Sequence, residues 1–197
     1  MLYLLDTCSY LRLAFSVHPL LGTIYYRPPE SANVTSEVNT EWEKQPRLKT
    51  KFHWAGDPQY VENRLQNLAQ LSGPQIKSIW ETRRFVQSHA QSSSRALREA
   101  RCTIPSSTDC AVLAYTLVLN SSHIPVTTVS DDRGMLWIAN DLQIPAITTL
   151  NLVHQMFQAG TQTLGNVQSL AGYLNYQKDL PPDWRIDGIK LFGVSLP

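Results

Sequence analysis

Cysteine, charge and long apolar runs are all scarce in this chain of 197 residues. The three cysteines form no CxxC pair, and their odd number disfavours a disulfide framework, so we expect a reducing, cytoplasmic environment. With 17% charged residues and a formal net charge of +1, the composition excludes a protein that coats nucleic acid through bulk positive charge. No apolar run reaches the length of a transmembrane helix, and no positive residue precedes the short apolar start, so we expect neither a membrane span nor a signal peptide.

Three common site motifs are also missing. The five histidines have no HExxH or CxxC company, so a zinc site is not expected. No glycine-rich phosphate-binding loop is present. An aspartyl-phosphate phosphatase would need a second aspartate two residues after Asp6, where the chain has Cys8. We expect Cys8 and Cys110 to be small buried residues.

A 43% hydrophobic content is enough for a sizeable core, and the length fits one domain with an appended part. Short apolar runs that end in polar residues alternate with helical periodicity, which is typical of an α/β fold. The expected strands are LYLL (2–5), ANVT (32–35), IPVTTVS (124–130) and IPAITT (144–149), and the expected helices between them span residues 9–15, 35–45, 105–120 and 131–142. The strand–helix–strand order near residue 130 predicts a right-handed crossover in a parallel sheet.

The remaining segments are expected to be loops and helices added to this sheet. Residues 18–33 contain three prolines and are predicted to be a loop, and residues 44–51 are a basic stretch broken by Pro46. Residues 57–101 carry two helical patterns, separated at Gly73, which we interpret as a helical hairpin inserted in a domain of residues 1–150. A C-terminal extension, residues 151–197, begins with two further amphipathic helices whose apolar stripes are expected to cover the sheet or to receive a partner.

Acidic residues follow the two strands that should lie side by side. Asp6 ends the first strand, and Asp131 and Asp132 end the strand at 124–130. Because sites in parallel sheets lie at the carboxyl ends of the strands, both groups should project from one edge. Asp109 falls in the first turn of a buried helix and Glu41 in the middle of another. Each has a simpler explanation: a helix cap for Asp109, Asp131 or Asp132, and a solvated charge for Glu41.

Together, the stretches LYLLDTCSYLRLA, VTSEVNTEW, PSSTDCAVLAYTLVLN and VSDDRGMLWIANDLQIPAIT resemble the PIN-domain nucleases over about residues 1–149. The resemblance implies a PIN-like parallel sheet flanked by helices. It also implies four catalytic acidic residues, which are Asp6, Glu41, Asp109 and Asp132. In the family's T-x-D segment, Ser130 takes the place of the threonine and Asp131 the variable position, which puts Asp132 rather than Asp131 at the site. The metal ligands would be Asp6, Asp109 and Asp132.

The resemblance further implies Mg²⁺ or Mn²⁺, since hard divalent cations prefer carboxylate oxygens and can activate water for phosphodiester hydrolysis. The expected activity is that of an endoribonuclease with an RNA substrate. Similarity to VapC-type toxins adds the toxin of a bacterial toxin–antitoxin pair, held inactive by a protein antitoxin. Two alternatives stay open, a PIN fold used as an inert binding or scaffold module and a nuclease that acts on DNA. The sequence also leaves open a homodimer, and whether the arginines and lysines of residues 44–51 and 83–101 contact a nucleic-acid backbone.

Overall fold

The computed structural model describes residues 1–22 and 31–197. Four strands are present in this part of the chain: β1 (Leu2–Leu5), β2 (Ser31–Val34), β3 (Val126–Val129) and β4 (Ala146–Ile147). The helices that precede β3 are α1 (Thr7–Leu13), α2 (Ser36–Lys44), α3 (Pro46–Lys51), the 3₁₀ turn η1 (His53–Gly56), α4 (Pro58–Gln66), α5 (Gly73–Ser92), α6 (Ser94–Glu99) and α7 (Ser107–Ser121). Those that follow β3 are α8 (Arg133–Asp141), α9 (Thr149–Gln158), α10 (Leu164–Tyr176) and α11 (Trp184–Phe192).

The strands form one parallel sheet in the order β2-β1-β3-β4. Leu5 at the end of β1 lies opposite Val34 of β2 and Val129 of β3, so three strands end at the same level. β1, in the centre, is almost entirely buried, as a strand covered on both faces must be. The predicted α/β class with a parallel sheet flanked by helices is confirmed.

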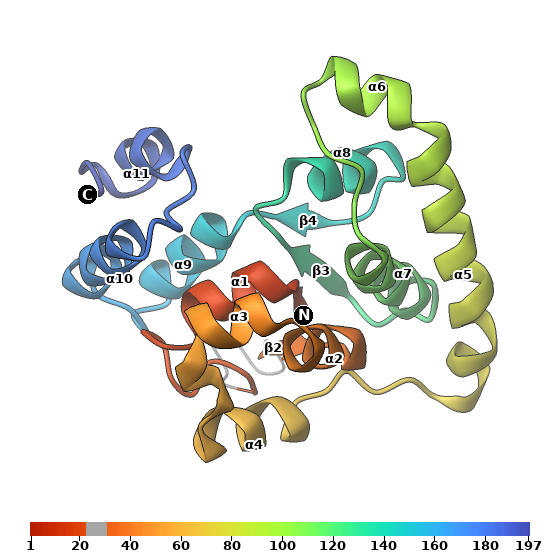
Figure 1. Cartoon of the computed structure of the whole chain (residues 1–197), viewed down its shortest axis with the longest axis horizontal. Helices are drawn as coiled ribbons and strands as arrows, with labels where there is room; N and C mark the ends of the chain where they lie inside the picture. Colours follow the sequence, from red (N-terminus) through yellow and green to blue (C-terminus); the bar gives the residue numbers. More distant parts are fainter. Residues whose placement is uncertain (23–30) are drawn as a thin grey trace.

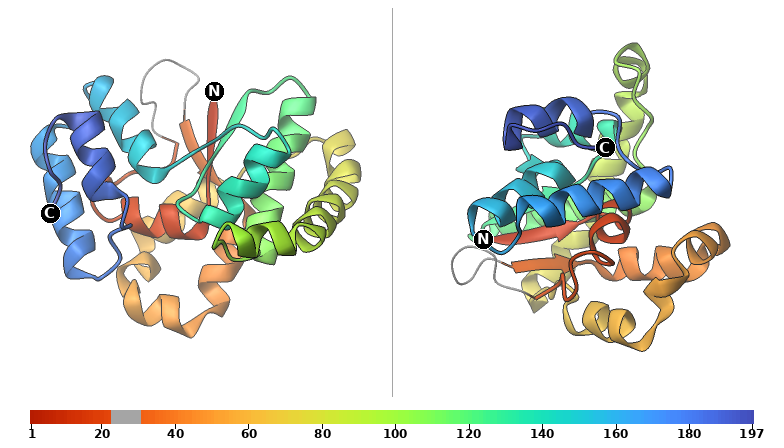
Figure 2. Two further views of the ribbon diagram at one scale, coloured as in Figure 1. Left: turned by 90° about the horizontal axis from the view of Figure 1, so that it is seen from above. Right: turned by 90° about the vertical axis from the view of Figure 1, so that its left-hand side faces the viewer.

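Helices cover the sheet on both faces. Figure 2 shows α1, α9, α10 and α11 on one side of the strands and α5, α7 and α8 on the other. The nearly apolar body of α7 lies against β1 and β3, and its buried residues include Val112, Leu113 and Ala114. An apolar helix of this kind is stable only when neighbours cover it, and α5 supplies the outer layer along its length.

Residues 57–101 form α4, α5 and α6, but the expected hairpin is wrong. α4 packs beside η1, whereas α5 packs along α7, so the two helices lie at different places around the sheet (Figure 1). The chain between them is extended, and Leu68 makes a bridge to Val34 at the edge of β2. The basic stretch at 44–51 is also more ordered than expected, because Pro46 begins α3 instead of interrupting the chain. Of the predicted loop at 18–33, residues 23–30 lie outside the described part and residues 31–33 belong to β2.

The C-terminal extension shares its core with the sheet. Buried side chains of α9, α10 and α11 belong to the same apolar cluster as β1, and they include Leu152, Met156, Leu170, Leu174 and Trp184. Tyr3 of β1 also donates a hydrogen bond of 2.7 Å to Gln155 of α9. The apolar stripes predicted for this region therefore pack inward. α11 is an addition to the expected elements, since no element was predicted for the last fifteen residues.

Candidate active site

The register of the sheet decides which polar residues meet at its carboxyl edge. Because Leu5, Val34 and Val129 are level, the next residues along the three strands are Asp6, Thr35 and Ser130. The backbone continues this pairing for one more step, since the Asp6 amide donates to the Val129 carbonyl at 3.1 Å. All three side chains are buried. The edge is therefore a polar, solvent-poor surface built on rigid strand ends.

Asp6 occupies the centre of this edge, and only 2% of it is exposed. One carboxylate oxygen caps α1 by accepting from the Ser9 amide at 2.6 Å, and the other accepts from the Ser130 hydroxyl at 2.5 Å. Burial raises the pKa of Asp6 to about 7, although these hydrogen bonds act in the opposite direction, and the nearby charge of Asp109 adds to the rise. A cation that enters the site would stabilise the charged form of this carboxylate, which burial disfavours.

Asp109 lies at the start of α7 and forms a capping box with Ser106. Its Oδ2 accepts from the Ser106 amide at 2.8 Å, and the Ser106 hydroxyl accepts from the Asp109 amide at 3.1 Å. The simple expectation of a helix cap is thus correct, but it is not the whole description. Burial raises the pKa of Asp109, and the charges of Asp132 and Glu41 raise it further. Two of the predicted acidic residues, Asp132 and Glu41, therefore act electrostatically on Asp109.

Asp131 and Asp132 divide two tasks between them. Asp131 forms an ion pair with Arg12 at 2.9 Å and accepts from the Thr149 amide at 3.0 Å, so both of its oxygens are engaged in holding α1 and α9. Asp132 caps α8 through Oδ1, which accepts from the Met135 amide at 2.7 Å. Its Oδ2 accepts no hydrogen bond from the described residues. The geometry therefore gives Asp131 a structural role and leaves one oxygen of Asp132 without a hydrogen bond from the described residues.

Glu41 reaches the site from the neighbouring helix. It lies on α2, whose N-cap is Thr35 at the sheet edge, so the strand end and the helix together fix its position. Its Oε2 accepts from the Thr7 hydroxyl at 2.5 Å, and its Oε1 accepts from the Gln45 side chain at 2.9 Å. The first of these contacts joins α2 to the residue that follows Asp6. Glu41 is therefore held at the acidic edge and is not merely a solvated charge.

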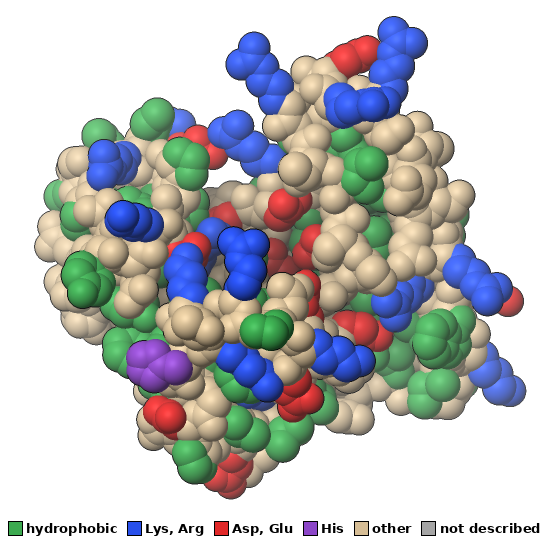
Figure 3. Space-filling view, in the orientation of Figure 1, with side chains coloured by type: hydrophobic (Ala, Val, Ile, Leu, Met, Phe, Trp, Pro, Cys, Tyr) green, Lys and Arg blue, Asp and Glu red, His purple; other side chains and the backbone are tan. Residues whose placement is uncertain are grey.

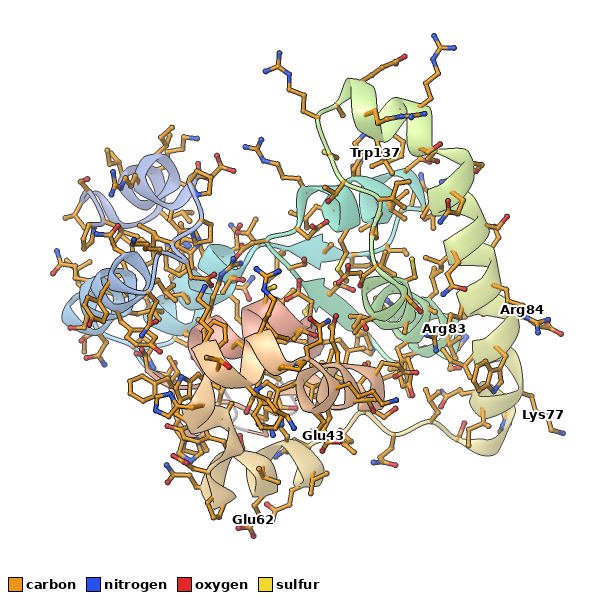
Figure 4. The ribbon with its side chains drawn as sticks, in the orientation of Figure 1. Glu43, Glu62, Lys77, Arg83, Arg84 and Trp137 are labelled. Carbon is orange, nitrogen blue, oxygen red and sulfur yellow. The ribbon has the colours of Figure 1, made fainter. Side chains whose placement is uncertain are left out.

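The charge of Asp109 thus acts on Asp6, and the charges of Asp132 and Glu41 act on Asp109. Figure 3 shows acidic side chains in a hollow at the middle of one face, with lysine and arginine side chains around it. Arg83 of α5 lies at the side of this region, where it donates to the Ser107 hydroxyl at 2.7 Å and lies 3.5 Å from Glu37. Arg84 and Lys77 point away from α7 into solvent (Figure 4), so they are not among the basic side chains around the hollow.

A shallow groove of about 420 Å³ runs beside Glu41 between α2, α5 and α7, and its lining includes Lys44, Arg83 and Thr108. It adjoins the acidic edge and carries two cationic side chains. An extended anionic chain could lie in this groove while one of its phosphates approaches the carboxylates.

The donor set has the chemistry that Mg²⁺ and Mn²⁺ prefer, because it consists of carboxylate and hydroxyl oxygens with no thiolate or imidazole engaged. Among residues 1–22 and 31–197, however, no group of three or more His, Cys, Asp or Glu side chains is arranged so that it could hold a metal ion. The carboxylate oxygens instead accept hydrogen bonds from helix N-termini and from hydroxyl groups. Asp109 and Asp132 each keep one oxygen that accepts no hydrogen bond from the described residues.

Residues beyond the four predicted acidic ones also build the site, and of these Arg12 was not indicated by the sequence. Ser130 and Thr7 donate to the carboxylates, and Arg12 fixes Asp131. Arg12 also pairs with Asp179 at 2.9 Å, and Asp179 in turn pairs with Lys51 at 2.6 Å, which ties the C-terminal extension to α1 and α3. The hydroxyl residues beside the strand-end aspartates were a usable signal. The ion pairs join residues more than 100 positions apart and leave no local pattern. Of the two cysteines beside the site, Cys110 is buried as expected and Cys8 is exposed.

Comparison of the chain with family models, with curated proteins and with solved structures finds no match. The fold and the candidate site are therefore known from the structure of this chain alone. Within the described residues, no helix combines the length and the apolar character needed to cross a membrane.

Proposed function

We propose that this protein is a metal-dependent nuclease of the PIN-like type, which hydrolyses phosphodiester bonds in single-stranded or structured RNA. One observation carries the proposal. Asp6 ends the central strand of the parallel sheet, burial and the charge of Asp109 raise its pKa to about 7, and burial with the charges of Asp132 and Glu41 raises the pKa of Asp109. A fold that gains nothing from such crowding would be more stable without it, so the arrangement favours a cationic ligand.

In this proposal each side chain has a distinct task. Asp6, Asp109 and Asp132 hold the cation, and Glu41 orients or deprotonates the attacking water from the side of α2. The bound Mg²⁺ or Mn²⁺ supplies a more acidic water and neutralises negative charge on the phosphate. Ser130 and Thr7 keep the carboxylates of Asp6 and Glu41 in place through their hydroxyl groups.

The charge around the hollow supports an anionic polymer as the substrate. Lysine and arginine side chains surround the acidic centre (Figure 3), and the groove beside Glu41 contributes Lys44 and Arg83. Basic side chains around an acidic centre can bind the phosphate backbone of a nucleic acid and position one phosphate at the carboxylates. Positive charge spread over the whole surface would bind the backbone without positioning it. The toxin role belongs to the same proposal, with an antitoxin protein that covers the hollow and blocks the substrate.

The proposal is tested by a cleavage assay on labelled single-stranded RNA and single-stranded DNA, with Mn²⁺, with Mg²⁺ and with a chelator. We expect wild-type protein to cleave RNA only when a metal is present, and we expect Asp6→Asn to lose activity by roughly a hundredfold or more. Glu62→Gln is the matched control, because Glu62 is an exposed carboxylate on α4 far from the hollow (Figure 4).

Equal cleavage by wild type and Asp6→Asn would remove the active-site assignment. Metal-dependent cleavage of DNA but not of RNA would move the activity to DNA. Binding of RNA without cleavage under every metal condition would favour the inert scaffold.

A further inference from the structure

A cavity of about 320 Å³ lies beside the acidic edge and has no part in the proposed chemistry so far. Its walls come from the start of α8 and from the C-terminal extension, and include Arg133, Leu136, Pro181, Pro182, Asp183 and Trp184. The volume falls in the range of small-ligand pockets, which start at about 300 Å³. The chain thus builds a pocket between its nuclease-like part and its extension.

The position of this pocket relative to the site is fixed by the chain itself. Asp131 and Arg133 both line it, and they flank Asp132 in sequence. On the far side, the segment before α11 is tied down, because Asp179 pairs with Arg12, which also pairs with Asp131. The pocket therefore lies at the same strand end as Asp132, between its two neighbours in the sequence.

The lining combines apolar walls with three carboxylates, which are those of Asp131, Asp183 and Asp187, and one guanidinium, that of Arg133. Leu136, Pro181 and Pro182 offer surfaces against which a planar ring can pack. Arg133 forms an ion pair with Asp183 at 3.0 Å, with 63% and 55% of the two side chains exposed, and a pair this exposed adds little stability. The guanidinium of Arg133 and the carboxylate of Asp183 can therefore bind a ligand instead of each other with little loss of stability.

Trp184 closes the buried side of the pocket. Trp184 is 2% exposed, and its indole Nε1 has no hydrogen-bond partner among the described residues. A buried donor without an acceptor lowers stability unless water or a ligand supplies one. Because this nitrogen is closed to solvent, Trp184 contributes an apolar wall to the pocket and not a hydrogen-bond donor.

We propose that this pocket receives a guanine base of the single-stranded substrate, next to the scissile phosphate. The inference rests on the proposed function for its substrate, a nucleic acid, and adds which part of that substrate is recognised. Guanine fits because it offers O6 and N7 as acceptors for the guanidinium of Arg133. It also offers N1–H and the 2-amino group as donors for the carboxylate of Asp183. Uracil and cytosine lack the paired acceptors, and adenine lacks the imino donor.

The C-terminal extension then has a task in recognition besides its contribution to the core. It supplies Asp183 and the two prolines, while α8 supplies Arg133 and Leu136. Single-stranded RNA is commonly read in this manner, by packing an unstacked base and bonding its edge. The base would set the position of cleavage, and the carboxylates at the sheet edge would carry out the chemistry.

The test is a binding titration by fluorescence anisotropy with the full chain, in a chelator so that nothing is cleaved. The probes are labelled uridine heptamers with guanosine, inosine or uridine at the central position. We expect wild-type protein to bind the guanosine probe about tenfold more tightly than the uridine probe, with inosine in between because it lacks the 2-amino group.

Two variants and one control locate the effect. Leu136→Trp fills the pocket and should bind all three probes alike, and Asp183→Asn should lose the preference for guanosine over inosine. Ile189→Trp adds the same bulk on an exposed face of α11 outside the pocket and should keep the wild-type preference. Thermal melts check that each variant is folded.

Equal binding of the three probes by wild type, or no binding of any, would overturn the pocket, as would a guanosine preference that persists in Leu136→Trp. The cleavage assay reports separately on the proposed function. Guanosine-dependent binding without metal-dependent cleavage keeps the pocket and removes the nuclease. Cleavage with no base preference removes the pocket and keeps the nuclease.

Discussion

Arg12 of α1 and Asp131, which follows β3, form an ion pair of 2.9 Å across 119 positions of sequence. Arg12 makes a second pair with Asp179, so one guanidinium joins the strand end, the first helix and the C-terminal extension. Both partners of the first pair are largely buried, with 15% and 7% of the side chains exposed. This pair and the Thr149 amide engage both oxygens of Asp131, whereas Asp132 keeps one oxygen that accepts no hydrogen bond from the described residues.

The two adjacent aspartates should therefore respond differently to the same substitution. Asp132→Asn should lower cleavage by roughly a hundredfold, while stability changes little because asparagine caps a helix about as well as aspartate. Asp131→Asn should lower the free energy of unfolding by about 1.5–3 kcal/mol, since it weakens a charged hydrogen bond in a largely buried place. Cleavage assays and urea denaturation on both variants measure these effects. The opposite pattern would show that Asp131 is the site residue and that the alignment is displaced by one position.

Metal-free protein should become less stable as the pH rises through the range in which Asp6 ionises. The folded protein holds a proton on Asp6 up to about pH 7, whereas the unfolded chain releases it near pH 3.8. The folded state thus binds more protons between these values, so the stability associated with this proton is fully present below pH 3.8 and is lost as the pH rises through 7.

Asp6→Asn removes this contribution to the pH dependence of stability, because asparagine does not titrate. Relative to wild type, the variant should gain on the order of 2 kcal/mol in unfolding free energy between pH 5 and pH 8. Any loss of hydrogen bonding to Ser9 or Ser130 is the same at both pH values and cancels. Denaturation in a chelator at the two pH values measures the gain, and identical pH dependence in the two proteins would show that Asp6 ionises normally.

Gly134 is required by a close approach of two segments beside the site. A Cβ atom there would lie 1.9 Å from the Thr103 carbonyl oxygen and 3.1 Å from Oδ1 of Asp132. Gly134→Ala must therefore displace the loop that leads into α7, and we expect a loss of about 1–3 kcal/mol in stability together with reduced cleavage. Gly172→Ala, on α10, meets nothing within 4 Å and should be neutral or stabilising. Thermal melts compare the two variants, and equal melting temperatures would contradict the close contact.

Removal of residues 151–197 should abolish cooperative folding. The segment contributes Leu152, Met156, Leu170, Leu174 and Trp184 to the core, and each buried side chain of this kind is worth about 1.5–3 kcal/mol. The truncated chain should aggregate or melt without a sharp transition, as measured by circular dichroism and size-exclusion chromatography. A soluble fragment with a cooperative melt would show that the extension folds as a separate layer.

The sequence predicts the sheet well because local pattern and tertiary role agree there. LYLL and VTTV are short apolar runs that end in polar residues, and AVLAYTLVLN can only be a buried helix, so their burial and order follow from composition. The strand-end positions of Asp6 and Asp132 follow from the same pattern. The arrangement of α4 and α5 does not, because their patterns show which faces are apolar but not which neighbour covers them.

The parts of the site that the sequence misses are those made by long-range polar contacts. Nothing near Arg12 in the chain indicates that it will meet Asp131 and Asp179, and nothing near Trp184 indicates a pocket beside α8. Pro46 was misleading for a different reason. A proline that breaks a helix in its interior is favourable in the first turn, and the choice depends on where the preceding helix ends.

Calorimetric titration of metal-free protein with Mn²⁺ tests the central claim, that the acidic edge of the sheet is a metal site. The comparison is between wild type, Asp109→Asn and the control Glu62→Gln. Asparagine can still accept the hydrogen bond from the Ser106 amide, so the start of α7 should keep its cap while the charge is lost. We predict one saturable binding event in wild type and in Glu62→Gln, weakened at least roughly tenfold in Asp109→Asn. Binding that is equally tight in Asp109→Asn, or absent from the wild type, would contradict the account.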